Sequence, residues 1–182
     1  SYPFQNHAPM EPMNATAVWT EEKCDVWCPT QNGEAAFAAT VEASGLPAEK
    51  CEVYKIHLGG GFGRRGMSDF VTQAVLLAKT MPGIPVKLLW TREEDMLQGR
   101  FHPITKARMK AGITKDGKLD SLHVRISGQS ILACVLPQAL RDGMDPVVFQ
   151  ALSAEGDHSI SYTVPNLLVD HAMRNTHITP GF

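Results

Sequence analysis

The chain has 182 residues, of which 43% are hydrophobic and 20% are charged, and this length suits one domain or one lobe of a larger one. The apolar fraction excludes general disorder, and 15 glycines with 12 prolines lie below the level of a low-complexity chain. Lysine and arginine number 17 against 19 aspartates and glutamates, which gives a net charge of −2. This balance provides no polyanion-binding surface, so we expect no nucleic-acid partner.

The first predicted elements are a hairpin and a helix. Residues 15–19 and 24–27 have the pattern of two strands joined by a short acidic turn. A helix is predicted over residues 31–44, and Gly45 is its expected stop. The apolar positions expected on the buried face of this helix are Ala35, Phe37, Ala38, Ala39 and Val41.

A strand over residues 51–58 is predicted to run directly into a glycine-rich loop at residues 59–66. Ser68 and Asp69 are expected to cap a second helix over residues 69–80. Its predicted buried face carries Phe70, Val71, Ala74, Leu77 and Ala78. A further strand at residues 85–90 leads into an acidic turn that we expect to begin a short helix.

Residues 104–114 and 118–128 form the clearest hairpin, because Asp116-Gly117 between two β-patterned segments is a strong turn signal. The expected later elements are helical turns near residues 136–140 and 147–152 and closing strands at residues 162–164 and 167–173. Hairpins mixed with two helices favour an α+β fold, with a mixed or antiparallel sheet on which the two main helices pack, over a doubly wound parallel sheet.

The four cysteines form no metal-binding or disulfide pattern. Cys24 and Cys28 are four positions apart, but no second cysteine pair or histidine pair follows at zinc-site spacing. On one strand the two thiols face the same side, too far apart for easy disulfide bonding. We expect all four cysteines, including Cys51 and Cys134, to be free thiols, and we predict no metal ligand.

The chemical signal of the sequence is concentrated in Gly59-Gly60-Gly61-Phe62-Gly63-Arg64-Arg65-Gly66. Glycine weakens both strands and helices, so this density of glycine indicates positive φ angles or a ligand that approaches the backbone. The loop is predicted between a strand and a helix N-terminus, where N–H groups and the helix dipole favour an anionic or strongly electronegative ligand.

Two nucleotide-binding interpretations of the loop fit poorly. Residues 61–66 satisfy G-x-G-x-x-G, but the preceding strand alternates charged and apolar residues, and no acidic residue stands about 20 positions later to bind a ribose. A triphosphatase phosphate loop would need Gly-Lys-Ser/Thr where this chain has Gly63-Arg64-Arg65. A purely structural glycine turn with two solvated arginines stays open as the alternative.

Further motifs accompany the loop along essentially the whole chain. They are His7-Ala8-Pro9-Met10-Glu11-Pro12, Thr30-Gln31-Asn32, Gly45-Leu46-Pro47, Pro85-Val86-Lys87, Trp90-Thr91-Arg92-Glu93-Glu94-Asp95-Met96, Gly99-Arg100-Phe101-His102-Pro103 and Tyr162-Thr163-Val164-Pro165-Asn166-Leu167. Together with the glycine loop, this ordered set resembles the large subunit of the molybdenum hydroxylases, the group of xanthine dehydrogenase and aldehyde oxidase. The Gly-Arg-Arg ending, with Met173-Arg174-Asn175-Thr176-His177, most resembles the isoquinoline 1-oxidoreductase β-subunit branch.

The resemblance implies that residues 1–182 are a single fragment of a molybdopterin-binding domain, whose ends lie within a longer protein. It implies a molybdenum cofactor held through its pterin without a protein ligand to the metal. The expected partners are the remainder of the large subunit, a small [2Fe-2S] subunit that removes electrons through its iron–sulfur cluster, and a small N-heterocycle or aldehyde. The implied reaction hydroxylates that substrate with water as the oxygen source.

The resemblance also implies roles for individual residues. Gln31 would donate a hydrogen bond to an oxygen ligand of the molybdenum, and a carboxamide suits this role because it donates without titrating. Gly60, Gly61, Phe62 and Gly63 would line the cofactor, with Phe62 and the Gly63 amide close to the apical ligand of the metal. Arg64 and Arg65 would contact a pterin phosphate or nucleotide, or alternatively form ion pairs with Asp69 and Glu93.

The chain departs from the complete family in two ways. The base glutamate of the family lies far toward the C-terminus of the large subunit and no segment here matches it, so we expect the isolated polypeptide to be inactive. Gly66 stands where xanthine-acting members carry a carboxylate, which argues against purine substrates. A non-catalytic binding or assembly module on the same scaffold is the alternative. The resemblance indicates a bacterial protein, and leaves its compartment open between cytoplasm and periplasm or membrane surface.

Overall fold

The computed structural model describes residues 3–146 and 162–182, which belong to two compact units. The loop unit comprises Asn6–Arg100 and Phe182, and it contains the glycine-rich loop. The hairpin unit comprises Phe101–Gly181 and the residues up to Gln5. We describe each unit by itself.

A four-stranded sheet forms the framework of the loop unit. Its strands are β1 (Asn14–Trp19), β2 (Cys24–Cys28), β3 (Cys51–Lys55) and β4 (Val86–Leu89), in the order β3-β2-β1-β4. β1 pairs antiparallel with β2 and β4, whereas β2 and β3 are parallel. The predicted hairpin and the predicted strand at residues 85–90 are therefore confirmed, and the strand predicted over residues 51–58 ends at Lys55.

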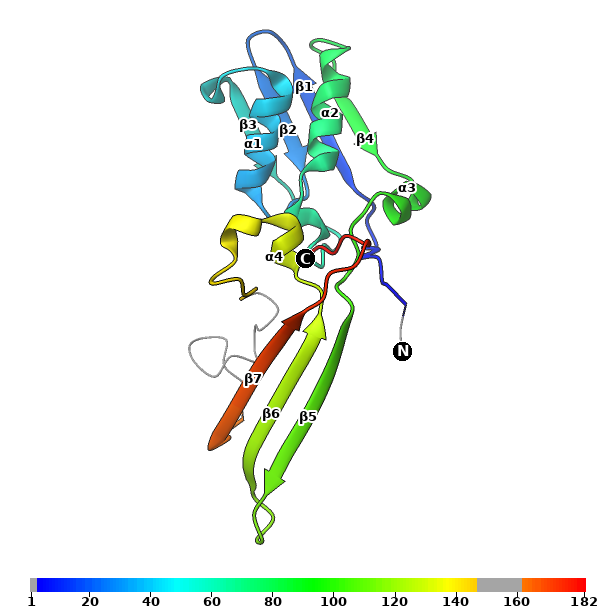
Figure 1. Cartoon of the computed structure of the whole chain (residues 1–182). Helices are drawn as coiled ribbons and strands as arrows, with labels where there is room; N and C mark the ends of the chain where they lie inside the picture. The colour runs from blue at the N-terminus through cyan, green and yellow to red at the C-terminus, as the bar shows by residue number, and fades with distance from the viewer. Residues whose placement is uncertain (1–2, 147–161) are drawn as a thin grey trace. The chain divides into compact units, whose positions relative to one another are not determined.

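Helices α1 (Gly33–Ser44) and α2 (Asp69–Lys79) cover one face of this sheet (Figure 1). The side chain of Asn32 caps α1 by accepting a hydrogen bond from the N–H of Ala35, and Gly45 ends the helix at a φ of 72°. The start of α1 at Gly33 leaves Gln31 outside the helix, although the sequence pattern placed it in the first turn.

The predicted buried faces of the helices need correction. In α1 the buried residues are Ala36, Thr40, Ala43 and Ser44, and the face through Ala35 and Ala38 is wrong. Alanines occur all round α1, so the apolar pattern cannot distinguish one face from another. In α2 the prediction holds at four positions, but Leu77 is 45% exposed and Val75 is buried instead. Ser68 precedes α2 without a side-chain capping bond.

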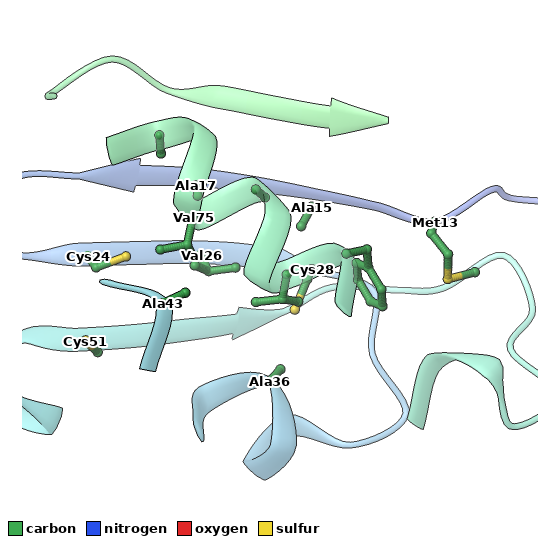
Figure 2. Packing of buried hydrophobic residues seen from close by; sticks show 14 of the residues in the cluster. Met13, Ala15, Ala17, Cys24, Val26, Cys28, Ala36, Ala43, Cys51 and Val75 are labelled. Atoms are coloured by element: carbon green, nitrogen blue, oxygen red, sulfur yellow. The ribbon is translucent and has the colours of Figure 1, made fainter. Parts of the chain in front are cut away.

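Small side chains dominate the core between the sheet and the helices (Figure 2). Figure 2 shows labelled core residues from both layers: Met13, Ala15, Ala17, Cys24, Val26, Cys28, Ala36, Ala43, Cys51 and Val75. Alternate residues of β2 point into this core, as expected for a strand with one covered face. On β2 and β3, Trp27 and Tyr54 are register partners, and their rings stack at a centroid distance of 5.1 Å.

The hairpin unit is built on a second, three-stranded sheet of β5 (Thr105–Ile113), β6 (Leu119–Gly128) and β7 (Asn166–Met173). The antiparallel β5–β6 pair confirms the predicted hairpin, and β7 pairs parallel to β6. The strand predicted at residues 162–164 is wrong. Pro165 follows that segment and lacks the N–H that a ladder needs, so the strand begins after it.

Two helical features follow β6 in this unit. A 3-10 turn at Pro137–Ala139 stands where a helical turn was predicted near residues 136–140, whereas helix α4 (Ile131–Val135) before it was not predicted. The turn predicted at residues 147–152 lies outside the described residues. In the loop unit, α3 (Arg92–Leu97) is the short helix expected after β4.

Two mixed sheets with two main helices confirm the expected α+β class. No helix among the described residues has the length and apolar character that crossing a membrane requires.

Candidate functional site

The glycine-rich loop lies between β3 and α2, as the sequence predicted. It ends in a 3-10 turn at Arg64–Gly66 that leads toward the N-terminus of α2. The φ angle of Gly63 is 97°, a conformation that L-residues with side chains rarely adopt. Glycine at this position is therefore required by the path of the backbone.

Gln31 lies against the glycine loop although the two are about thirty residues apart in sequence. The backbone N–H of Gly63 donates to Oε1 of Gln31 at 3.0 Å, and the N–H of Gln31 donates to the carbonyl of Arg65 at 3.1 Å. A β-carbon at Gly61 would lie 2.3 Å from Oε1 of Gln31, so only glycine allows this approach. The structure thus brings together the two segments that the sequence assigned to one site.

The orientation of the Gln31 carboxamide leaves its donor side available. Oε1 is used by Gly63, whereas Nε2 makes no hydrogen bond to any residue in the described part of the chain. The side chain of Gln31 is exposed. The resemblance implied that the Gly63 amide lies beside a ligand of the metal. In the structure that amide donates to Gln31 instead, so Nε2 of Gln31 is the donor of this pair that is left for a ligand.

Phe62 is the apolar residue of the loop, and its ring is exposed. It has a φ of 53° and an exposed fraction of 65%. A non-glycine residue in the left-handed region costs about 1–2 kcal/mol, and an exposed phenyl ring gains little from burial in return. A β-carbon at Gly60 would lie 3.2 Å from the Phe62 ring, so the ring lies beside the Gly60 backbone.

Arg64 forms an ion pair, as one alternative expected, but it is buried, so the interpretation of Arg64 and Arg65 as solvated surface charges is wrong. Its guanidinium forms two hydrogen bonds with the carboxylate of Asp69, at 2.9 and 2.7 Å, and lies 5.4 Å from the ring centroid of Trp90. Only 2% of the Arg64 side chain is exposed. The ion pair predicted with Asp69 is present, and no ion pair with Glu93 occurs among the described residues.

Arg65 is completely buried, and it binds parts of the chain on both sides of the loop. It donates to the carbonyl oxygens of Gly60, Pro29, Glu11 and Pro12 and to Oε2 of Glu11, at distances from 2.6 to 3.3 Å. Burial lowers the pKa of Arg65, and the charge of Glu11 opposes that shift. The sequence did not predict Glu11 as the partner, although the Glu11-Pro12 motif was a signal for it.

The described residues hold no group of three or more His, Cys, Asp or Glu side chains that could bind a metal ion. The four cysteines are free, as expected, and three of them are buried. Burial raises the pKa of Cys28 to about 11, so its thiol is protonated at neutral pH.

The arrangement fits the pterin-type cofactor that the resemblance implied. The absence of a side chain at Gly61 lets the Gln31 carboxamide pack directly against the loop, and Nε2 of Gln31 offers a neutral donor there. The guanidinium groups of Arg64 and Arg65 bind Asp69 and Glu11 within the chain. We therefore interpret both arginines as residues that stabilise the loop.

The chain is similar to a known family and to several proteins of known sequence. A family model described as "Molybdopterin cofactor-binding domain" matches residues 1–181. The chain is 30% identical over 135 residues to the isoquinoline 1-oxidoreductase subunit beta of Brevundimonas diminuta, which covers 72% of this chain and 17% of that protein. It is 35% identical over 102 residues to the xanthine dehydrogenase/oxidase of Gallus gallus, which covers 55% of this chain and 7% of that protein.

A solved structure shares the fold. Quinoline 2-oxidoreductase from Pseudomonas putida 86 matches 70% of this chain and 16% of its own length, with a TM-score of 0.58 and 23% identity. The chain therefore spans 17% or less of the length of each of these three relatives. Since the family model matches residues 1–181 of 182, the chain belongs to the molybdopterin cofactor-binding domain family of the molybdenum hydroxylases.

Proposed function

We propose that this chain forms one wall of the molybdenum-cofactor site in an oxidoreductase that hydroxylates N-heterocycles or aldehydes with water as the oxygen source. The observation that carries the proposal is the approach of Gln31 to the glycine loop, where Gly63 donates to Oε1 at 3.0 Å and Nε2 is left facing outward. When bound, the cofactor supplies two-electron redox chemistry at molybdenum.

The residues of the chain bind and orient the cofactor in this proposal. Gln31 donates a hydrogen bond from Nε2 toward the site, and it stays neutral throughout because a carboxamide does not titrate. Gly60, Gly61 and Gly63 let the backbone approach the cofactor closely, and the exposed ring of Phe62 excludes water beside them. Arg64 and Arg65 contribute by fixing the shape of the loop.

The complete activity requires more than this chain. The remainder of the large subunit would supply the base, and a small [2Fe-2S] subunit would accept the electrons. Neither Glu11 nor Glu34 replaces that base: Glu11 is engaged by Gly59, Asn14 and Arg65, and Glu34 lies in the first turn of α1. The single domain fragment of residues 1–182 is therefore proposed to be inactive alone.

The proposed substrate class rests on the proteins to which the chain is similar and not on a substrate pocket in the structure. Isoquinoline 1-oxidoreductase and aldehyde oxidases are among the similar proteins, which favours an electron-poor carbon in an N-heterocycle or an aldehyde as the reacting group. Gly66 replaces the carboxylate expected in xanthine-acting members, and this favours substrates other than purines.

Cofactor loading of the full-length protein tests the proposal. Gly63→Val should abolish loading, since a β-branched residue tolerates neither a φ of 97° nor close approach of a ligand. Gly66→Ala is the matched control, because its β-carbon meets no atom within 4 Å and its φ is not positive. Molybdenum and pterin are measured per folded chain. Normal cofactor content in folded Gly63→Val would remove the loop from the site.

A further inference from the structure

We infer that Glu11 is a positioning residue, which holds the glycine loop in its cofactor-binding conformation before the cofactor arrives. The inference rests on the proposed function, because it takes the loop to be a wall of the cofactor site. Glu11 itself lies outside the loop, in the segment before β1, and its carboxylate has been described so far only as a partner of Gly59, Asn14 and Arg65.

Glu11 and Gly59, the first residue of the loop, each donate one hydrogen bond to the other. Its Oε2 accepts a hydrogen bond from the N–H of Gly59 at 2.8 Å, and its own N–H donates to the Gly59 carbonyl at 3.2 Å. A β-carbon at Gly59 would lie 2.6 Å from the β-carbon of Glu11. Gly59 is therefore the point at which the loop start is fixed to the N-terminal segment.

The same oxygen of Glu11 connects the start of the loop to its end. Oε2 also accepts from Nη2 of Arg65 at 2.9 Å, and Nε of Arg65 donates to the Gly60 carbonyl at 2.8 Å. One carboxylate and one guanidinium thus close a ring across the loop. Phe62 and Gly63 lie between the two fixed ends, so their positions depend on this ring.

The second oxygen of Glu11 attaches the ring to the sheet. Oε1 accepts a hydrogen bond at 3.0 Å from Nδ2 of Asn14, the first residue of β1. Asn14 is buried, and its backbone pairs with Leu89 of β4. Through Glu11 and Asn14, the loop is therefore attached to the sheet as well as to its own neighbours in the chain.

Glu11 is ionised when it makes these contacts. Burial alone raises the pKa of Glu11, but the hydrogen bonds from Gly59 and Asn14 and the charges of Arg65 and Lys87 outweigh burial and hold the pKa below its usual value. An ionised carboxylate only accepts hydrogen bonds. This matches its contacts, which all come from donors and occupy both of its oxygens.

A fixed loop matters because glycine is the most flexible residue. A free glycine segment populates many conformations, and a ligand that binds one of them loses affinity in proportion to the fraction populated. Residues 59–61 are three consecutive glycines. Glu11 removes this loss in advance by ordering the loop in the apo protein.

Hydrogen exchange in the full-length apo protein tests the inference. Glu11→Gln keeps the side-chain volume but places an NH₂ group where acceptors are needed, so the amides of residues 59–66 should exchange at least about tenfold faster, the factor that corresponds to about 1.4 kcal/mol. Asn14→Ala removes the bond to Oε1, together with the bond from the same Nδ2 to the Pro12 carbonyl, but leaves both contacts of Oε2, and should give a smaller change in the same peptide. Glu52→Gln, at an exposed position of β3, is the matched control and should leave the exchange of residues 59–66 unchanged.

Molybdenum and pterin content are measured on the same variants. Faster local exchange with lower cofactor content supports the inference, and unchanged loop exchange in folded Glu11→Gln overturns it. Faster exchange with full cofactor content also overturns the positioning role. If Gly63→Val still blocks cofactor loading in that case, only the positioning role of Glu11 is rejected. If Gly63→Val loads the cofactor normally, the proposed function itself is rejected. Should Glu11→Gln fail to fold, exchange and cofactor content of Asn14→Ala decide by the same criteria.

Discussion

Oε1 of Gln31 accepts a hydrogen bond from the backbone N–H of Gly63 at 3.0 Å. The carboxamide therefore joins the segment between β2 and α1 to the glycine loop between β3 and α2. The acceptor side of Gln31 therefore serves the loop, while Nε2 serves the proposed site. Substitutions at this residue can separate the two roles, because glutamate retains the acceptor and loses the donor.

We predict that both Gln31→Ala and Gln31→Glu lower kcat of the full-length enzyme by about a hundredfold, the effect of losing one donor toward an oxygen that gains negative charge. A carboxylate at this position also repels such an oxygen, so the glutamate variant should be at least as slow. Gln31→Glu should retain normal loop exchange and cofactor content, because it still accepts from Gly63. Steady-state kinetics on variants with measured molybdenum content provide the check. A near-normal kcat for Gln31→Ala would exclude Gln31 from the chemistry.

Gly61→Ala should displace Gln31 from the loop. The new β-carbon would lie 2.3 Å from Oε1, so the carboxamide must move and the bond to Gly63, worth about 1 kcal/mol, is lost. We expect cofactor content to fall together with kcat. Gly66→Ala adds the same methyl group in open space and should leave cofactor content unchanged. Equal behaviour of the two alanine variants would contradict the close approach.

The buried thiols should be unreactive in the folded protein. Burial raises the pKa of both Cys24 and Cys28 to about 11, so at pH 7 only about one thiol in ten thousand is ionised. Alkylation followed by peptide mass spectrometry should modify the partly exposed Cys134 first. Cys24, Cys28 and Cys51 should react only after unfolding, and rapid modification of Cys28 under native conditions would be inconsistent with the core.

The contribution of Glu11 to stability should disappear in acid. Its pKa is lower in the folded state than in the unfolded chain, so the contribution is complete above the ordinary glutamate pKa of about 4.3 and is lost as the pH falls through the lower folded value. The difference in unfolding free energy between wild type and Glu11→Gln should be constant above about pH 5 and shrink below about pH 4. Denaturant unfolding at several pH values measures this difference, and a difference that grows in acid would reverse the assigned sign.

The elements that local chemistry specifies could be predicted from the sequence. Asp116-Gly117 requires a turn between β-patterned segments, and the β5–β6 hairpin follows. Gly45 provides the left-handed residue that ends α1, and the strand–glycine–helix order around residues 59–66 is specified in the same way. Each of these features depends on residues that are neighbours along the chain.

The side-chain partners could not be predicted in the same way. Alanines lie on several sides of α1, so the choice of Ala36 and Ala43 as part of its buried face is made by the packing against α2 and the sheet. Arg65 has Glu11 as its partner across 54 positions of sequence. No local periodicity carries that information, because the partner is selected by where the N-terminal segment passes the loop.

By itself, the sequence determined the position of the glycine loop and its placement between β3 and α2, and the resemblance of its ordered motifs implied that Gln31 and the loop belong to one site. Only the tertiary structure decided that Gln31 accepts from Gly63, that Arg64 and Arg65 are buried, and that Glu11 holds Gly59. The physical reason is that backbone conformation follows from adjacent residues, whereas a buried guanidinium must find acceptors wherever the folded chain supplies them.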